Sequence, residues 1–408
     1  MEFDYNTLKQ IENEVGDSWY FLDIERFISN YKEFLKAFQD IYPQTQIAYS
    51  YKTNYIPLIC KTVDDLGGFA EVVSDMEYFL ALDIGIKPKN IVVNGPYKPK
   101  NELKRYLLNG SIVNVDSFQE LDLVMKVVIE HKNTKFSIGI RCNFEIEGYP
   151  PSRFGVDVTD PRFEKALVEI SKTSNLDLVS IHCHYPYREV SSFQGRVDGI
   201  LEVYDRVVKY CSPKYIDIGG GLGGKISKEL MEHLGVKNVE YADYANIIAK
   251  TVHAKFKEDE NKPILLMEPG TALVADAMSF FCKILGIKEV RGRAIACSSG
   301  SRVNFHSRTS KLNMPIRVFS KNQGYRKKHE SIDIGGYTCM EEDYIYRSYN
   351  GDLETGDYVA VDNVGSYSIV FKPPFINPNV PVVTFVENEL RVIKNKETYE
   401  DVFKTYIK

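Results

Sequence analysis

The sequence of 408 residues lacks long apolar runs, blocks of basic residues and Cys-x-x-Cys pairs. A transmembrane helix needs about 20 mainly apolar residues in a row, and no segment approaches that length. Binding along a nucleic-acid backbone needs a concentrated basic face, but the 51 Lys and Arg residues are outnumbered by 56 Asp and Glu residues. We therefore expect a protein that binds neither membranes nor nucleic acids.

The seven cysteines are scattered, and their number is odd. This fits reduced thiols better than a disulfide framework or a zinc site. Residues 1–17 are polar and acidic and contain no apolar segment of the kind found in signal peptides. These features together predict a cytoplasmic location.

The first two-thirds of the chain alternates between short runs rich in Val and Ile and longer amphipathic stretches. Eight alternating strands and helices over about 250 residues predict a (β/α)₈ TIM-type barrel. An open, doubly wound sheet is the alternative, but it usually has fewer strands. The eight candidate strands are Gln46–Tyr49, Phe69–Val73, Ile91–Asn94, Ser111–Val115, Phe136–Arg141, Leu178–His182, Tyr215–Ile218 and Ile264–Met267.

Two helix starts are predicted from N-cap chemistry and early acidic residues. One is at Ser74-Asp75-Met76-Glu77, and the other is within Asp116–Leu121, which offers a choice of N-cap. After residue 280 the helical periodicity fades. Short strand candidates follow, with turns expected at Tyr349-Asn350-Gly351-Asp352 and Thr355-Gly356-Asp357. We expect a segment 1–25 that packs with a β domain, a barrel at 26–280, and a C-terminal all-β domain at 281–408. The C-terminal strand candidates are Ile284–Val290, Tyr358–Val361 and Val380–Val386.

Chemically useful residues stand within or just after the barrel strands, whose carboxyl ends form the active face of this fold. Each has an ordinary explanation when taken alone: a solvated lysine, a capped acid or a tight glycine turn. As a set they are more specific, because they converge on one mouth of the barrel. They are Lys52, Glu71, His182, His184, Gly219, Gly220, Gly221 and Glu268.

A lysine, a glycine loop and an acid suit pyridoxal 5′-phosphate. The amine forms a Schiff base, the loop holds the phosphate, and the acid keeps the ring nitrogen protonated. A zinc hydrolase is the alternative, but His182-Cys183-His184 is the only dense cluster of ligand-type residues, and adjacent strand residues point to opposite faces. We expect one of His182 and His184 to face inward and the other to enter the packing.

The sequence resembles the barrel-type, fold type III pyridoxal-phosphate decarboxylases, the group of diaminopimelate and ornithine decarboxylases, over nearly its whole length. Several separate motifs match in the same order, and the implied fold is the barrel plus β domain that alanine racemase also has. The matching segments are Tyr49–Asn54, Ala70–Ser74, Ile181–His184, Ile216–Gly221, Glu268–Gly270, Gly336–Asp343 and Asn363–Tyr367.

The resemblance implies a role for each matching residue. Lys52 carries the cofactor, His184 stacks on its ring, and Glu268 pairs with the ring nitrogen. Cys339 protonates the α-carbon and reaches into the neighbouring subunit, which implies a homodimer with shared active sites. The implied cofactor-binding set is Lys52, Glu71, His184, Gly219, Gly220, Gly221, Glu268 and Tyr367.

Four departures from the family pattern concern the substrate. The family's Arg-Pro-x-(Leu/Met)-Tyr substrate segment has no clean match in Asn313-Met314-Pro315-Ile316-Arg317. Thr271 follows Glu268-Pro269-Gly270 where the family has arginine, and Met340 follows Cys339 where diaminopimelate enzymes have glutamate. Tyr185-Pro186-Tyr187 replaces Ile-Gly-Ser. We therefore expect decarboxylation of an amino acid or an amino-acid-bearing conjugate other than meso-diaminopimelate. Candidate substrate-reading residues, each equally explained as part of a solvated loop, are Arg302, His306, Arg308, Arg317 and Glu341.

Three other functions remain open. One is diaminopimelate decarboxylation in lysine biosynthesis. Another is racemisation or epimerisation, which would use a tyrosine from the second domain as a base, whereas Thr338-Cys339 favours decarboxylation. The third is a non-catalytic regulatory homologue, which the presence of Lys52, Glu268 and Cys339 disfavours.

Overall fold

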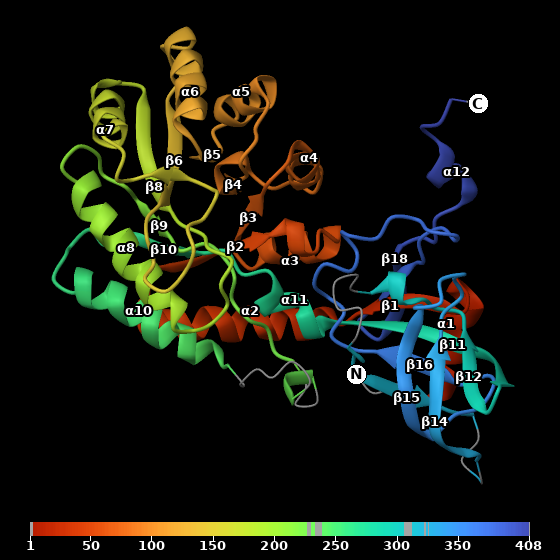
Figure 1. Ribbon diagram of the computed structural model, residues 1–408. Helices are drawn as coiled ribbons and strands as arrows, with labels where there is room; N and C mark the ends of the chain where they lie inside the picture. The colour runs from red at the N-terminus through yellow and green to blue at the C-terminus, as the bar shows by residue number, and fades with distance from the viewer. Residues whose placement is uncertain are drawn as a thin grey trace. The chain divides into compact units, whose positions relative to one another are not determined.

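The computed structural model describes residues 3–226, 230–232, 239–305, 312–321, 324 and 326–407. The chain divides into two compact units. One comprises Asn30–Gly223 and Val239–Ala272, and the other comprises Met1–Ser29, Gly224–Asn238 and Leu273–Lys408. Figure 1 shows the first unit as strands ringed by helices and the second as a unit made mainly of sheet.

The first unit contains a closed ring of eight parallel strands, because β5 pairs with β6 as well as with β4. All eight strands predicted from the sequence are present, with ends shifted by at most two residues. A two-residue strand, β7 (Val156–Asp157), pairs with the end of β6. The barrel strands are β2 (Thr45–Ser50), β3 (Phe69–Val72), β4 (Ile91–Val93), β5 (Ile112–Val115), β6 (Phe136–Asn143), β8 (Leu176–His182), β9 (Tyr215–Asp217) and β10 (Ile264–Met267).

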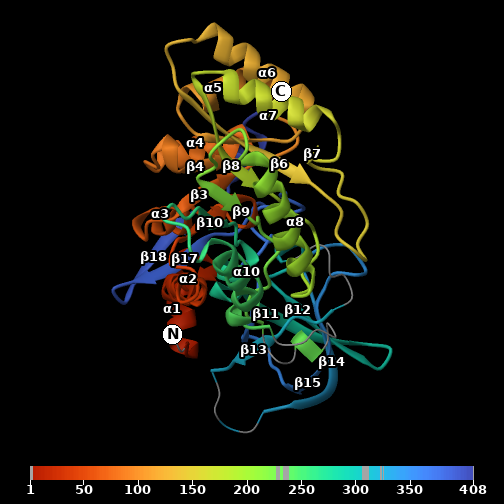
Figure 2. The same ribbon diagram turned by 90° about the vertical axis from the view of Figure 1, so that its left-hand side faces the viewer.

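Helices follow the strands around the outside of the barrel. Both predicted helix starts are confirmed, and the caps are two serines: Ser74 accepts from the Glu77 N–H at 3.2 Å, and Ser117 accepts from the Glu120 N–H at 3.2 Å. Helices α8 and α10 pack side by side, as both views show (Figures 1 and 2). The helices are α2 (Ile24–Gln39), α3 (Pro57–Asp65), α4 (Asp75–Asp83), α5 (Lys100–Leu108), α6 (Phe118–Glu130), α7 (Arg162–Lys172), α8 (Ser192–Val207), α10 (Tyr241–Phe256) and the short α11 (Thr271–Val274).

The inside of the barrel has an apolar layer below a polar one. Successive strand residues alternate between faces, so residues two apart share a face. The buried apolar cluster is formed by Ala48, Val92, Ile112, Tyr215 and Leu266. Two residues further along the same five strands stand Ser50, Asn94, Asn114, Asp217 and Glu268, all buried.

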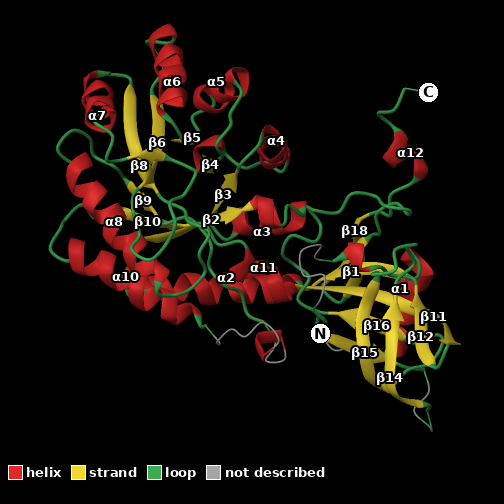
Figure 3. Cartoon of the chain, viewed as in Figure 1, coloured by secondary structure: helices red, strands yellow, loops and turns green. Residues whose placement is uncertain are grey.

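The second unit is built on a nine-stranded sheet, drawn in yellow in Figure 3. Strand β1, from the N-terminal segment, pairs antiparallel with β11 and parallel with β17. The strands are β1 (Ser18–Leu22), β11 (Met278–Val290), β12 (Arg293–Ser298), β13 (Ile316–Phe319), β14 (Lys328–Gly335), β15 (Tyr344–Asp352), β16 (Tyr358–Val361), β17 (Val382–Val386) and β18 (Glu389–Lys394).

Two helices, α1 (Tyr5–Val15) and α12 (Tyr399–Phe403), belong to the same unit. Leu8 and Ile11 of α1 pack into a core with Trp19, Phe281 and Tyr358. The Trp19 and Phe281 rings stack with centroids 5.4 Å apart.

One predicted turn is wrong. Asn350 and Gly351 lie inside β15, where Gly351 pairs with His329 of β14. The register of this pair shifts repeatedly, and Ser348 has φ 54°. The irregular strand β15 therefore includes residues that, taken alone, favour a turn. The turn at Thr355-Gly356 is confirmed, with Gly356 at φ 95°.

No helix in the described part of the chain is both long enough and apolar enough to cross a membrane.

Candidate active site

Lys52 lies immediately after β2, in the 3₁₀ turn Tyr51–Thr53. Its side chain is 35% exposed, and its Nζ forms an ion pair with the fully buried carboxylate of Glu71 on β3. Ser50 Oγ donates to the same carboxylate. The register that places Ser50 opposite Glu71 therefore brings an amine and an acid together at the barrel mouth.

Asn94 connects this pair to the second acid of the site. Its Nδ2 donates to Glu71 Oε1 at 2.9 Å and to Glu268 Oε1 at 2.6 Å. Its Oδ1 accepts from Asn114 Nδ2 at 2.8 Å. From the sequence, Asn94 is predicted only as the last residue of a strand. The structural signal for its role is its position two residues beyond a buried Val on an inward face.

Glu268 follows β10 and is grouped with two other buried ionisable residues. His182 Nε2 lies 3.5 Å from Glu268 Oε2, and one atom each from His182, Asp217 and Glu268 lie within 4.8 Å of one another. Burial alone would raise the pKa of Glu268, but His182 and Lys52 outweigh it and hold that pKa below its ordinary value. Burial and the Glu268 charge raise the pKa of Asp217 well above its ordinary value. The pKa values of the two carboxyl groups in the cluster are thus shifted in opposite directions.

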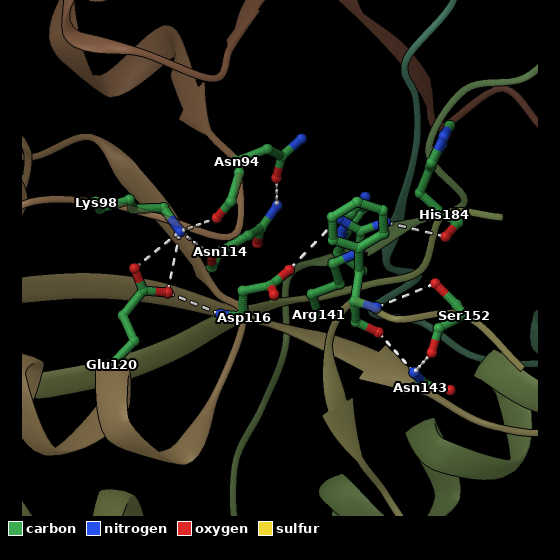
Figure 4. Close-up of polar contacts among 12 residues, drawn as sticks. Asn94, Lys98, Asn114, Asp116, Glu120, Arg141, Asn143, Ser152 and His184 are labelled. Atoms are coloured by element: carbon green, nitrogen blue, oxygen red, sulfur yellow. Dashed lines mark hydrogen bonds and ion pairs between the residues drawn. The ribbon is translucent and has the colours of Figure 1, made fainter. Parts of the chain in front are cut away.

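His184 is held in place by its backbone and its ring. Arg141 Nη2 donates to the His184 carbonyl at 3.1 Å, and Arg141 Nη1 lies 3.4 Å from Asp116 Oδ1, as Figure 4 shows. The Gly220 N–H donates to His184 Nδ1 at 3.0 Å. Burial, reinforced by the charges of Arg141 and Lys52, places the pKa of His184 well below its ordinary value. The imidazole is therefore neutral.

The prediction that one histidine faces inward and the other enters the packing is wrong. His182 contacts Glu268 and His184 contacts the glycine loop. Residues two apart on an extended strand share a face, so both reach the site.

A second network of polar contacts in Figure 4 stabilises the neighbouring strand ends. Lys98 is buried, and its Nζ lies 3.0 Å from Glu120 Oε2 and donates to the Asn114 carbonyl at 2.9 Å. Glu120 also accepts the Asp116 N–H at 2.8 Å. This network links the loop after β4 and the start of α6 to Asp116, the residue that pairs with Arg141.

The glycine loop after β9 passes close to its neighbours. A Cβ on Gly219 would lie 2.5 Å from the Cys183 carbonyl oxygen, and one on Gly220 would lie 2.6 Å from the Glu268 carbonyl oxygen. Gly219 and Gly221 have φ of 71° and 89°, a region that favours glycine. The Gly219 N–H donates to Asp217 Oδ1 at 2.8 Å. Only glycine can therefore form this turn beside His184 and Glu268.

In the second unit, Asp343 organises the loop that carries Cys339. Its buried carboxylate accepts from Ser301 Oγ at 2.9 Å, from the Arg302 N–H at 2.8 Å and from Thr338 Oγ1 at 2.6 Å. Cys339 itself is an exposed free thiol. The loop is thus held at its base and presents the thiol outward.

The remaining predicted residues of the second unit have different surroundings. Glu341 is exposed and Arg302 is half-buried. Arg317 donates two hydrogen bonds of 2.7 Å to Asp362, so its guanidinium is already paired with a carboxylate. Tyr367 has φ 61° and stacks on Phe371. His306 and Arg308 lie outside the described residues.

The barrel residues fit pyridoxal phosphate. The site offers a part-exposed amine on Lys52, a charged buried acid on Glu268 and a neutral imidazole on His184. The Gly219–Gly221 turn brings bare backbone close to His184 and Glu268, where a Cβ on Gly219 or Gly220 would clash. These are the groups needed to hold an aldehyde carbon, a ring nitrogen, a ring face and a phosphate.

Comparison with known proteins points the same way. Residues 26–275 match the family model described as the pyridoxal-binding domain of pyridoxal-dependent decarboxylases. A diaminopimelate decarboxylase of Aquifex aeolicus is 27% identical to this chain, over 97% of this chain and 92% of its own length.

Solved structures share the fold. Diaminopimelate decarboxylase of M. jannaschii in complex with L-lysine has a TM-score of 0.85 at 24% identity, covering 98% of this chain and 94% of that one. Lysine decarboxylase from Selenomonas ruminantium has a TM-score of 0.77 at 19% identity, covering 95% and 97%. The barrel and the sheet unit are thus found together in enzymes that carry different substrate names.

Proposed function

The chain belongs to the pyridoxal-dependent decarboxylase family and uses pyridoxal phosphate; from that premise we propose that it decarboxylates an amino acid or an amino-acid-bearing conjugate other than meso-diaminopimelate. One observation carries the proposal. The amine of Lys52 and the buried acid Glu268 are joined through Glu71 and Asn94 in one polar layer. Pyridoxal phosphate, when bound, withdraws electrons from the substrate α-carbon so that the bond to the carboxylate can break.

Each barrel residue has a defined part in this proposal. Lys52 provides the amine that attaches the cofactor, and Glu71 accepts a hydrogen bond from it and fixes its position. Glu268 remains charged and keeps a proton on the ring nitrogen, since a carboxylate with a lowered pKa stabilises a neighbouring cation. Neutral His184 can lie against the ring face without repelling that cation.

We further propose that the thiol of Cys339 returns a proton to the α-carbon and serves the barrel of a second subunit. Its exposed position supports such a role. Lys52→Ala and Cys339→Ala homodimers should each be inactive. Mixing the two should restore activity, because a heterodimer has one intact composite site. No recovery after confirmed subunit exchange would place the site within one chain, or exclude Cys339 as the acid.

The substrate proposal depends on uncharged residues at positions that read the far end of diaminopimelate in the resembling enzymes. Thr271 begins α11 and Met340 is 41% exposed. Neither carries the charge of the residue it replaces, so neither can supply that residue's hydrogen bonds between two charged groups, worth about 1.5–3 kcal/mol each. Two such losses would lower specificity for that substrate by about two to four orders of magnitude. Arg317 does not compensate, since Asp362 occupies it.

Diaminopimelate decarboxylation is the second candidate. It is favoured by relatives of that name that match 97% of this chain. The deciding measurement is kcat/KM for meso-diaminopimelate beside L-amino acids, D-amino acids and amino-acid conjugates. We expect meso-diaminopimelate to be a poor substrate and another amine-bearing carboxylate to be turned over far better. A high value for meso-diaminopimelate that nothing else exceeds would establish the second candidate instead.

A further inference from the structure

Arg196, on α8, places a guanidinium directly behind the glycine loop. Its exposed fraction is 0%. Nη1 donates to the Gly220 carbonyl at 3.0 Å, and Nη2 donates to the Tyr187 carbonyl and, at 3.3 Å, to Ser192 Oγ. The guanidinium carbon lies 3.9 Å from the centre of the Phe193 ring. A permanently charged group is therefore surrounded by neutral partners.

This charge has no counter-ion among the residues that the structure describes. The acceptors that bind Arg196 are two carbonyls and a hydroxyl, and its Nε is buried without a hydrogen-bond partner. An arginine cannot release its proton at physiological pH, and a buried unpaired charge is strongly unfavourable. Such an arrangement is expected where a bound ligand supplies the anion.

The position of the charge identifies which part of a ligand it would meet. A Cβ on Gly221 would lie 3.4 Å from Arg196 Nη1. Two N–H groups of the loop are already engaged: Gly219 donates to Asp217 and Gly220 donates to His184. An anionic group resting on this loop therefore needs a positive charge from another source.

We propose that Arg196 supplies the buried positive charge that holds the phosphate of the cofactor at the Gly219–Gly221 loop. The inference rests on the proposed function, because it assigns the loop to the phosphate. Arg196 acts from behind the loop through the Gly220 carbonyl and through its charge. It is thus a positioning residue for the phosphate and takes no part in the reaction at the α-carbon.

A purely structural role is the competing explanation, because Arg196 also links the Gly220 loop to the Tyr187 loop. The two roles differ in what they predict for pyridoxal, which lacks the phosphate. Loss of a phosphate-directed charge weakens binding of pyridoxal phosphate selectively, whereas loss of a structural link weakens binding of both compounds equally.

The experiment compares the dissociation constants of pyridoxal phosphate and pyridoxal for cofactor-free protein, followed by absorbance. Arg196→Met removes the charge and keeps a long apolar side chain. Arg196→Lys keeps the charge but loses the forked geometry. The matched control is Arg206→Met, on the same helix, where Arg206 is 32% exposed and pairs with Glu164 at 3.0 Å.

We expect Arg196→Met to weaken binding of pyridoxal phosphate by on the order of tenfold or more and binding of pyridoxal by less than about threefold. Arg196→Lys should fall between it and the wild type, and Arg206→Met should match the wild type. Should the Met variant fail to fold, Arg196→Gln is put through the same comparison.

Equal weakening of both compounds, or unchanged affinity for pyridoxal phosphate, would overturn the inference. A wild-type protein that binds pyridoxal phosphate but is not reduced onto Lys52 by borohydride would instead overturn the proposed function. The ratio of the two affinities would still report on Arg196.

Discussion

Replacing Asn94 by alanine removes the group that joins the two acids of the site. Its Nδ2 donates to Glu71 at 2.9 Å and to Glu268 at 2.6 Å, and all three residues are buried. A hydrogen bond to a charged group contributes about 1.5–3 kcal/mol. The two bonds together predict that the free energy of unfolding of the barrel falls by about 3–6 kcal/mol.

This loss is measurable by urea unfolding of the cofactor-free protein. At an m-value of about 3 kcal/mol/M, the midpoint would fall by about 1–2 M. The only tryptophan, Trp19, belongs to the sheet unit, so its fluorescence does not follow the barrel. Far-ultraviolet circular dichroism, dominated by the barrel helices, is the suitable signal.

The matched control is Asn109→Ala. Asn109 is exposed, and its Nδ2 donates to the hydroxyl of Tyr78, a neutral partner, at 3.1 Å. We expect a loss of about 1 kcal/mol or less. If Asn94→Ala costs no more than this control, the two acids do not depend on Asn94, and the reasoning that places it at the centre of the polar layer is refuted.

Three further predictions concern pH, packing and attachment of the cofactor. Burial, followed by the charge of Glu71, raises the pKa of Glu77 from 4.5 to about 7, although the hydrogen bond from the Val73 N–H lowers it. The contribution of protonated Glu77 to the free energy of unfolding is therefore complete below pH 4.5 and is lost as the pH rises through 7. Relative to the wild type, Glu77→Gln should be more stable at pH 8 than at pH 5 in urea unfolding, and a constant difference would contradict the shift. Gly270→Ala would place a Cβ 2.0 Å from Thr53 Oγ1, next to Lys52, and should weaken cofactor binding several-fold; Gly286→Ala, with nothing within 4 Å, should not. Borohydride reduction should attach the cofactor covalently to Lys52. If peptide mapping finds the reduced adduct on another lysine, Lys52 is not the residue that holds the cofactor.

The sequence was sufficient for the barrel because its local signals agree with its packing. Each predicted strand is a short, mainly apolar run that ends in or is followed by a polar residue or glycine, and the eight runs close into one ring. Lys52 and Glu268 could be picked out because they follow strands directly. Ser74 and Ser117 marked helix starts because the capping bond is formed within four residues.

Residues that act across strands were harder to predict. The role of Asn94 depends on Glu268, 174 positions away in the chain. Arg196 is one of several charges on an amphipathic helix, and nothing in its local sequence distinguishes it from Arg206. The turn expected at Asn350-Gly351 failed because pairing with β14 outweighs local turn preference. Long-range pairing decides each of these cases.

The apolar layer beneath the site also affects its electrostatics. Ala48, Val92, Ile112, Tyr215 and Leu266 form one buried cluster under the polar layer. Charges interact more strongly where water is excluded. The contacts that join Lys52, Glu71, Asn94 and Glu268 therefore gain strength from the apolar side chains below them.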